Sequence, residues 1–156
     1  MSVTAGVSQA PDVLSGLLVP LSDRTLLLPN VAIAELIPYR APQPEAGRPD
    51  WYLGQVAWRD LPLPLLSFEA AAGGEPVVGA TPRIAILNAL GGRDKVKFIA
   101  LLIQGIPRSM RVTRDLPSAG RAPGLLELDV VRLGDQDAVI PDLAALEARL
   151  GEVGLL

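Results

Sequence analysis

The sequence predicts an all-β protein of two small antiparallel barrels, closed or nearly closed, followed by a short C-terminal helix. Proline and glycine number 15 each among the 156 residues, and they interrupt the chain about once every ten residues. The segments between them are short apolar runs of strand length, whereas a single stretch near the C-terminus has a capped helical pattern. A chain of this length suits one compact domain, or two small barrels that share a core.

The first strands are expected after an N-terminal tail. Residues 1–16 have no apolar periodicity and little charge, so we expect them to be flexible. Leu17–Leu21 and Thr25–Leu28 are apolar runs on either side of a polar Ser-Asp-Arg turn, which predicts a hairpin. The next run, 31–39, is apolar except for Glu35, whose parity places it on the apolar face. Its carboxylate therefore needs a partner or a route to solvent, which leaves a strand-end position and a binding role as alternatives.

The stretch from Trp51 to Phe68 holds four of the six aromatic residues. Its first half alternates like a strand, with Val56 and Trp58 on one side and Arg59 on the other. The tight turn expected at Arg59-Asp60 should expose Arg59, held at most by a local ion pair with Asp60. An exposed arginine on a rigid hairpin suits a binding surface, and the alternative is a packed hairpin with no further role.

Three more strands are expected between residues 61 and 104. Pro62 and Pro64 are two residues apart, so in a strand their missing N–H groups would lie on the same side. A strand that cannot donate hydrogen bonds on one side is expected at a sheet edge or at a barrel seam. The segments 83–90 and 96–104 are apolar on both parities, as in strands buried on two faces. The polar loop 91–95 joins them, and its glycine pair precedes no Gly-Lys-Ser/Thr sequence, so we do not predict a phosphate-binding loop.

The C-terminal part predicts two strands, 125–133 and 138–140, and then the helix. Asp142 is a suitable N-cap, Leu143–Leu150 carries one apolar stripe, and Gly151 can end the helix. Residues 151–156 would then form a C-terminal tail.

The composition excludes several kinds of chemistry. The chain has no cysteine, which excludes disulfides and thiolate catalysis, and no histidine, the commonest general base and metal ligand. No spaced pair of carboxylates suggests acid–base catalysis, so we expect neither an enzyme nor a metal or other cofactor. No apolar run approaches the ~20 residues of a membrane span, and the N-terminus lacks a basic signal region. We therefore expect a cytoplasmic protein without membrane insertion.

The net charge of −3 conceals an asymmetry, because residues 83–121 hold eight basic and two acidic side chains. Such a distribution can steer an acidic partner or nucleic acid, or can simply be solvated surface. A nucleic-acid-binding barrel of the OB type that uses this stretch is therefore the rival function. Phe98 is its only aromatic residue, whereas base stacking needs several, so we expect no nucleic acid as a partner.

Several blocks of the sequence resemble the CheW-like coupling proteins of bacterial chemosensory arrays. The core motif of that family is similar to Gly54-x-Val56-x-x-Arg59-Asp60 with the following Leu63-Pro64-Leu65-Leu66-x-Phe68. Asp60 stands where the family usually has glycine, and Ser67 where it usually has aspartate. Two further blocks are similar to family strands, namely Ile33-Ala34-Glu35-Leu36-Ile37 and Ile103-Gln104-Gly105-Ile106.

The resemblance implies two SH3-like five-stranded barrels over a common core, forming one CheW-like domain of two intertwined subdomains at 17–150. It implies a non-catalytic adaptor that joins the cytoplasmic tip of a methyl-accepting chemoreceptor to the regulatory domain of a histidine kinase. The sequence further resembles the branch of the family that serves pilus-based twitching motility, in segments 26–30, 34–37 and 65–68. The residues expected to contact partners are Ile33, Glu35, Gly54, Trp58, Arg59, Asp60, Gly105, Met110 and Val112, and one receptor groove is expected between Ile33, Glu35, Met110 and Val112.

Overall fold

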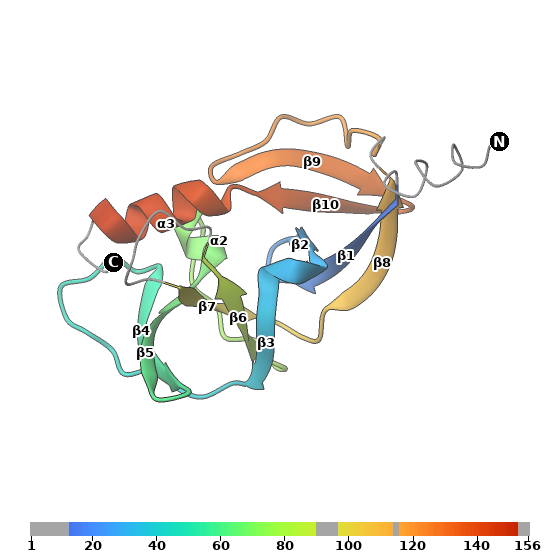
Figure 1. Ribbon diagram of the computed structural model, residues 1–156. Helices are drawn as coiled ribbons and strands as arrows, with labels where there is room; N and C mark the ends of the chain where they lie inside the picture. The colour runs from blue at the N-terminus through green and yellow to red at the C-terminus, as the bar shows by residue number, and fades with distance from the viewer. Residues whose placement is uncertain (1–12, 90–96, 114–115, 153–156) are drawn as a thin grey trace.

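The computed structural model describes residues 13–89, 97–113 and 116–152 (Figure 1). Within these ranges ten strands form two five-stranded sheets, accompanied by three short helical segments. The elements in chain order are β1 (Val13–Pro20), β2 (Thr25–Pro29), η2 (Asn30–Ala32), β3 (Ile33–Pro38), β4 (Tyr52–Trp58), β5 (Leu61–Leu66), α2 (Phe68–Ala71), β6 (Arg83–Asn88), β7 (Phe98–Ile103), β8 (Arg108–Thr113), β9 (Glu127–Leu133), β10 (Gln136–Pro141) and α3 (Leu143–Glu152).

The two sheets draw on different parts of the chain. The terminal sheet, of order β8-β1-β2-β10-β9, combines strands from both ends, and the central sheet, of order β3-β6-β7-β5-β4, uses the middle of the chain. In Figure 1 the sheets lie side by side, with α2 and α3 near each other at the end of the central sheet. The chain thus enters the terminal sheet, builds the central one and returns, which intertwines the two units.

The strand patterns in the central sheet follow the predicted parity. Along β4 the inner positions, including Val56 and Trp58, are buried, and Gln55 and Ala57 are exposed. β6 and β7 are buried on both faces for nearly their whole length, as expected for strands between two packed layers. These predictions are confirmed.

One hydrophobic core is shared by both sheets and by α3. It joins Val19 and Leu26 of the terminal sheet to Leu66 and Leu101 of the central sheet, with Leu146 from α3 between them. Each such side chain contributes about 1.5–3 kcal/mol when fully buried. Two smaller clusters lie one on each sheet and complete the interiors of the barrels. The fold of two small barrels over a common core is confirmed.

The predicted boundaries differ from the structure at both ends. β1 begins at Val13 and pairs with β8 from Val13↔Thr113 onward, so the flexible tail predicted for residues 1–16 is wrong at 13–16. Local periodicity misses this strand because its partner lies far along the sequence. At the other end, the Asp142 carboxylate accepts a hydrogen bond from the Ala145 amide at 3.0 Å, so the predicted N-cap is confirmed. The helix continues past Gly151 to Glu152.

β5 is not an edge strand, contrary to one of the two alternatives predicted from its prolines. It lies between β7 and β4, but it pairs with β7 only at Leu65 and Leu66. Pro62 and Pro64 precede that pairing, so their missing N–H groups remove no bond from the β5–β7 ladder. The predicted loop 91–95 lies outside the described residues.

Candidate functional site

The β4–β5 hairpin ends in a two-residue turn made by Arg59 and Asp60. Both residues are left-handed, with φ of 50° and 64°, as a two-residue turn between right-twisted strands requires. The Arg59 side chain is 70% exposed, as predicted, and its guanidinium lies 4.6 Å from the centre of the Trp58 ring. The ion pair predicted between Arg59 and Asp60 is wrong, because Arg59 Nη2 lies 3.0 Å from Glu35 Oε1 instead.

Glu35 closes the central barrel. It lies on β3 at one end of the sheet order, and its Oε1 also accepts a hydrogen bond from Trp58 Nε1 at 3.2 Å, on β4 at the other end. The half-buried carboxylate therefore has the partners that its position on the apolar face required. The Trp58 ring is buried and meets Phe98 edge-on, with ring centres 4.8 Å apart. Trp58 thus supports the turn from inside and offers little surface to a partner.

Gly54 is needed for packing within the central barrel. Its φ is 134°, and a Cβ atom there would lie 2.4 Å from the carbonyl oxygen of Gln43. The backbones of Gln43 and Gln55 exchange two hydrogen bonds, at 2.9 and 3.0 Å, so this segment covers the free edge of β4. The backbone approach explains why only glycine fits here, and it leaves Gly54 buried.

An apolar groove of about 460 Å³ opens on the terminal barrel. It is lined by Ser15, Gly16, Leu27, Leu28, Pro29, Asn30, Val31, Val112, Thr113, Leu116 and Ile140. Val31 stands at its rim with 74% of its surface exposed, and the carbonyl of Val31 accepts a hydrogen bond from Asn88 Nδ2 at 2.8 Å. An exposed valine on an ordered turn, beside aliphatic walls, is the kind of surface that binding partners cover.

The apolar groove does not bring together Ile33, Glu35, Met110 and Val112, the four residues predicted to border one receptor groove. Val112 lines the apolar groove, and Met110 lines an adjoining hollow of about 310 Å³. Ile33 instead packs against the shared core, and Glu35 faces the hairpin turn. The η2 turn and the bulge between Ile33 and Glu35 carry β3 away to the central barrel.

Gly105, the remaining predicted contact residue, lies in the link between β7 and β8. A Cβ atom there would sit 3.3 Å from Pro20 Cγ, so Gly105 packs closely against the end of β1. Neither the apolar groove nor the adjoining hollow is lined by it.

The comparisons with known proteins agree with this architecture. The family model described as CheW-like domain matches residues 15–149. The chain belongs to the CheW-like domain family. The crystal structure of the scaffolding protein TtCheW from Thermoanaerobacter tengcongensis matches with a TM-score of 0.70 at 13% sequence identity, covering 83% of this chain and 84% of that one. At this identity the likeness shows the fold, two SH3-like barrels. The comparison with curated proteins finds no match.

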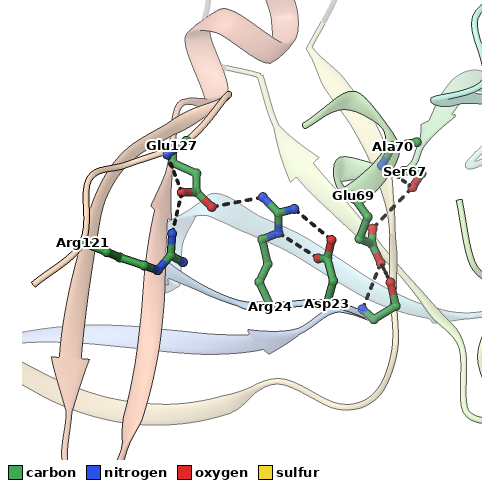
Figure 2. Close-up of polar contacts among 9 residues, drawn as sticks. Asp23, Arg24, Ser67, Glu69, Ala70, Arg121 and Glu127 are labelled. Carbon is green, nitrogen blue, oxygen red and sulfur yellow. Dashed lines mark hydrogen bonds and ion pairs between the residues drawn. The ribbon is translucent and has the colours of Figure 1, made fainter. Parts of the chain in front are cut away.

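In this CheW-like domain a polar network that the sequence did not predict joins the two barrels (Figure 2). Arg24, in the β1–β2 turn, lies 2.8 Å from Asp23 and 3.0 Å from Glu127 on β9. Its guanidinium also lies 5.5 Å from the centre of the Phe68 ring, on α2. Hydrogen bonding to the Arg24 guanidinium lowers the pKa of Asp23. Arg24 thus contacts the β1–β2 turn, strand β9 of the terminal sheet, and helix α2, which follows strand β5 of the central sheet.

Two buried carboxylates complete the network. Glu69 on α2 is 1% exposed and accepts hydrogen bonds from the amide and hydroxyl of Ser22, at 2.9 and 2.7 Å. Glu127 also accepts a bond from the Gly124 amide at 2.7 Å. Both carboxylates are therefore satisfied, as burial demands. Ser67, which replaces the aspartate usual in the family, caps α2 by accepting a bond from the Ala70 amide at 3.2 Å.

The nucleic-acid alternative rests on the basic stretch 83–121, of which the structure describes residues 83–89, 97–113 and 116–121. Its strands β6 and β7 are buried, and Arg121 pairs with Glu127 at 3.5 Å. Within residues 13–89, 97–113 and 116–152, no group of three or more acidic side chains is placed to hold a metal ion. No helix in the same ranges is long and apolar enough to cross a membrane.

Proposed function

We propose that this CheW-like domain is a non-catalytic scaffold that couples a chemoreceptor to a histidine kinase in a bacterial chemosensory pathway of the cytoplasm. The observation that carries the proposal is the apolar groove of the terminal barrel, in a chain whose family match covers residues 15–149. The groove would take the cytoplasmic tip of a methyl-accepting receptor. The hairpin turn of the central barrel would take the regulatory domain of the kinase.

The groove suits an apolar stripe on a partner. Most of its lining is aliphatic, and the exposed Val31 at its rim would be buried by a partner without any change in the fold. Covering one valine contributes about 1–2 kcal/mol, and the aliphatic walls add to this. Grooves of this kind accept the apolar face of a helix.

The hairpin turn suits a second, more polar partner. Arg59 is held by Glu35 and by the Trp58 ring, so little side-chain entropy is lost when it binds. Beside it, Leu61 is 46% exposed, and Asp60 lines a hollow of about 300 Å³ of mixed polarity. Arginine on a rigid support is typical of binding hot spots. Because the groove and the turn belong to different barrels, both partners can be bound at once.

We also propose that the pathway controls pilus-based twitching motility. Support comes from the three segments that resemble that branch of the family, 26–30, 34–37 and 65–68. Four residues of the first segment, Leu27 to Asn30, line the groove. The resemblance therefore includes the surface assigned to the receptor.

Titration calorimetry with a receptor-tip fragment and the kinase regulatory domain tests the proposal. Val31→Asp should weaken receptor binding at least about tenfold and leave kinase binding unchanged. Arg59→Glu should weaken kinase binding by about 2 kcal/mol and leave receptor binding unchanged. Arg40→Glu, the same charge change at an exposed loop position, is the matched control. Wild-type protein that binds neither partner would contradict the proposed function.

A further inference from the structure

The short helical turn η2 carries Val31, the exposed residue at the rim of the apolar groove, and it links the two barrels. Strand β2 before it belongs to the terminal sheet, and strand β3 after it belongs to the central sheet. None of the three residues of η2 is buried. Ala32 packs against the shared core, whereas Val31 belongs to none of the three clusters of core residues described above. The turn is therefore held in place by little packing of its own.

Asn88 holds this turn from the central sheet. Its side-chain Nδ2 donates a hydrogen bond to the carbonyl oxygen of Val31 at 2.8 Å. Asn88 is the last residue of β6, and the four residues before it are buried. Asn88 pairs with Phe98 of β7, and the adjacent Leu87 pairs with Ile33 of β3. The amide that holds Val31 therefore lies on a strand that is fixed by ladders on both sides.

The hydrogen bond from Asn88 is not needed to satisfy the carbonyl of Val31. Val31 is 74% exposed and Asn88 is exposed as well, so water can bind both groups when the bond is absent. Folding exchanges such bonds with bonds to water, and the net contribution of an exposed one to stability is small. The bond does fix where the Val31 side chain lies, because the carbonyl and the side chain belong to one residue of a three-residue turn. It thus determines the geometry of the rim more than the stability of the fold.

We propose that Asn88 is a positioning residue of the groove, whose amide holds the η2 turn so that the Val31 side chain is presented to the receptor. This inference rests on the proposed function, since it takes the groove as the receptor site. A turn that is already ordered loses little conformational entropy on binding, whereas a loose turn must be ordered by the partner. The receptor site on the terminal barrel thus depends on a residue of the central barrel, which also carries the hairpin turn assigned to the kinase.

The chain offers a matched control for this hydrogen bond. Gln104 Nε2 also donates to the carbonyl oxygen of an exposed valine, Val77, at the same distance of 2.8 Å. The groove is lined by neither Gln104 nor Val77. Gln104→Ala therefore tests whether the loss of a comparable bond elsewhere on the surface affects the receptor.

Backbone NMR relaxation of the full chain tests the positioning without any partner. The Val31 amide should have an order parameter of about 0.85 in the wild type, as ordered backbone does, and it should fall towards about 0.6 in Asn88→Ala. Asn88→Asp keeps the shape of the side chain but has no N–H to donate, so it should behave like Asn88→Ala. Gln104→Ala should leave the value for Val31 unchanged. An unchanged value in both Asn88 variants would overturn the proposal.

Titration calorimetry with a receptor-tip fragment tests the consequence for binding. Asn88→Ala should weaken binding about fivefold, the size expected for one hydrogen bond, and Gln104→Ala should leave it unchanged. Because Asn88 acts through Val31, Asn88→Ala should have no further effect in a Val31→Ala background. Additive effects of the two substitutions would overturn the proposal, as would an unchanged affinity in Asn88→Ala.

Failure of the proposed function would give a different result. Wild-type protein that binds no receptor-tip fragment would refute the receptor role of the groove, and the binding role of Asn88 with it, even if the order parameter of Val31 falls as expected. The melting temperature of Asn88→Ala and Asn88→Asp should equal that of the wild type. A fall of several degrees in both variants would mean that the bond stabilises the fold, and it would overturn the positioning role.

Discussion

Replacing Arg24 by methionine tests whether its buried ion pair with Glu127, which links the β1–β2 turn to β9, stabilises the fold. The Arg24 side chain is 16% exposed and its partner Glu127 only 4% exposed, so this ion pair is largely shielded from water. Removing one partner of a buried pair costs about 3–5 kcal/mol, because the other charge is left uncompensated. The loss of the contact with the Phe68 ring adds about 0.5–1 kcal/mol.

Two features reduce this cost. Glu127 keeps the Gly124 amide at 2.7 Å and Arg121 at 3.5 Å, and methionine retains part of the packing of the arginine stem. The exposed pair with Asp23 contributes little to stability. We therefore expect Arg24→Met to lower the free energy of unfolding by about 2–4 kcal/mol.

Denaturant unfolding of the variant measures this loss, with Arg40→Met as an exposed control that should change stability by less than about 0.5 kcal/mol. A double-mutant cycle with Glu127→Gln should give a coupling energy of about 1–3 kcal/mol. If Arg24→Met unfolds within about 0.5 kcal/mol of the wild type, the buried pair of Arg24 and Glu127 does not stabilise the fold, which would contradict this expectation.

Three further variants or titrations test other parts of the structure. Gly54→Ala should cost about 3 kcal/mol or more, since it combines strain with a backbone clash, whereas Gly47→Ala, also at positive φ but in open space, should cost about 1 kcal/mol by denaturant unfolding. Burial, reinforced by a hydrogen bond to a loop glutamate, raises the pKa of Tyr52 to about 12. Tyr52 should therefore stabilise the fold below pH 10 and lose that contribution as the pH rises towards 12. In the variant Tyr39→Phe, where Tyr52 is the remaining tyrosine, the absorbance of the phenolate should not appear near pH 10. The lowered pKa of Asp23 means that its stabilisation is present above its ordinary pKa of 3.8 and is lost on acidification, so Asp23→Asn should differ from wild type more at pH 6 than at pH ~2.5. An equal difference at both pH values would contradict this.

Local sequence patterns were sufficient to predict the burial or capping role of a residue where that role depends on its neighbours in sequence. The alternation around Val56 predicted the inner face of β4, and the doubly apolar runs predicted that β6 and β7 are buried. Asp142 was identified as an N-cap because the Ala145 amide, which donates a hydrogen bond to its carboxylate, lies within one helical turn. Such features depend on contacts of short range, which periodicity and capping rules describe.

The features that the sequence did not predict depend on contacts between segments that are distant in the chain. Arg59 pairs with Glu35 rather than with the adjacent Asp60, because the ends of the central sheet meet when it curls into a barrel. Arg24 meets Glu127 through the return of the chain to the terminal sheet. The groove is likewise missed, since η2 turns Val31 outward. Nothing in the local sequence of these segments identifies such partners.

The most direct test of the proposed coupling role is a competition measurement with both proposed partners present. A labelled receptor-tip fragment is bound to the wild-type protein, and the kinase regulatory domain is then added while complex masses are followed by analytical ultracentrifugation. Separate surfaces on the two barrels predict a three-component complex, and Val31→Asp should lose the receptor from it while keeping the kinase. Displacement of the receptor by the kinase would mean that the two compete for one surface, and it would contradict the account.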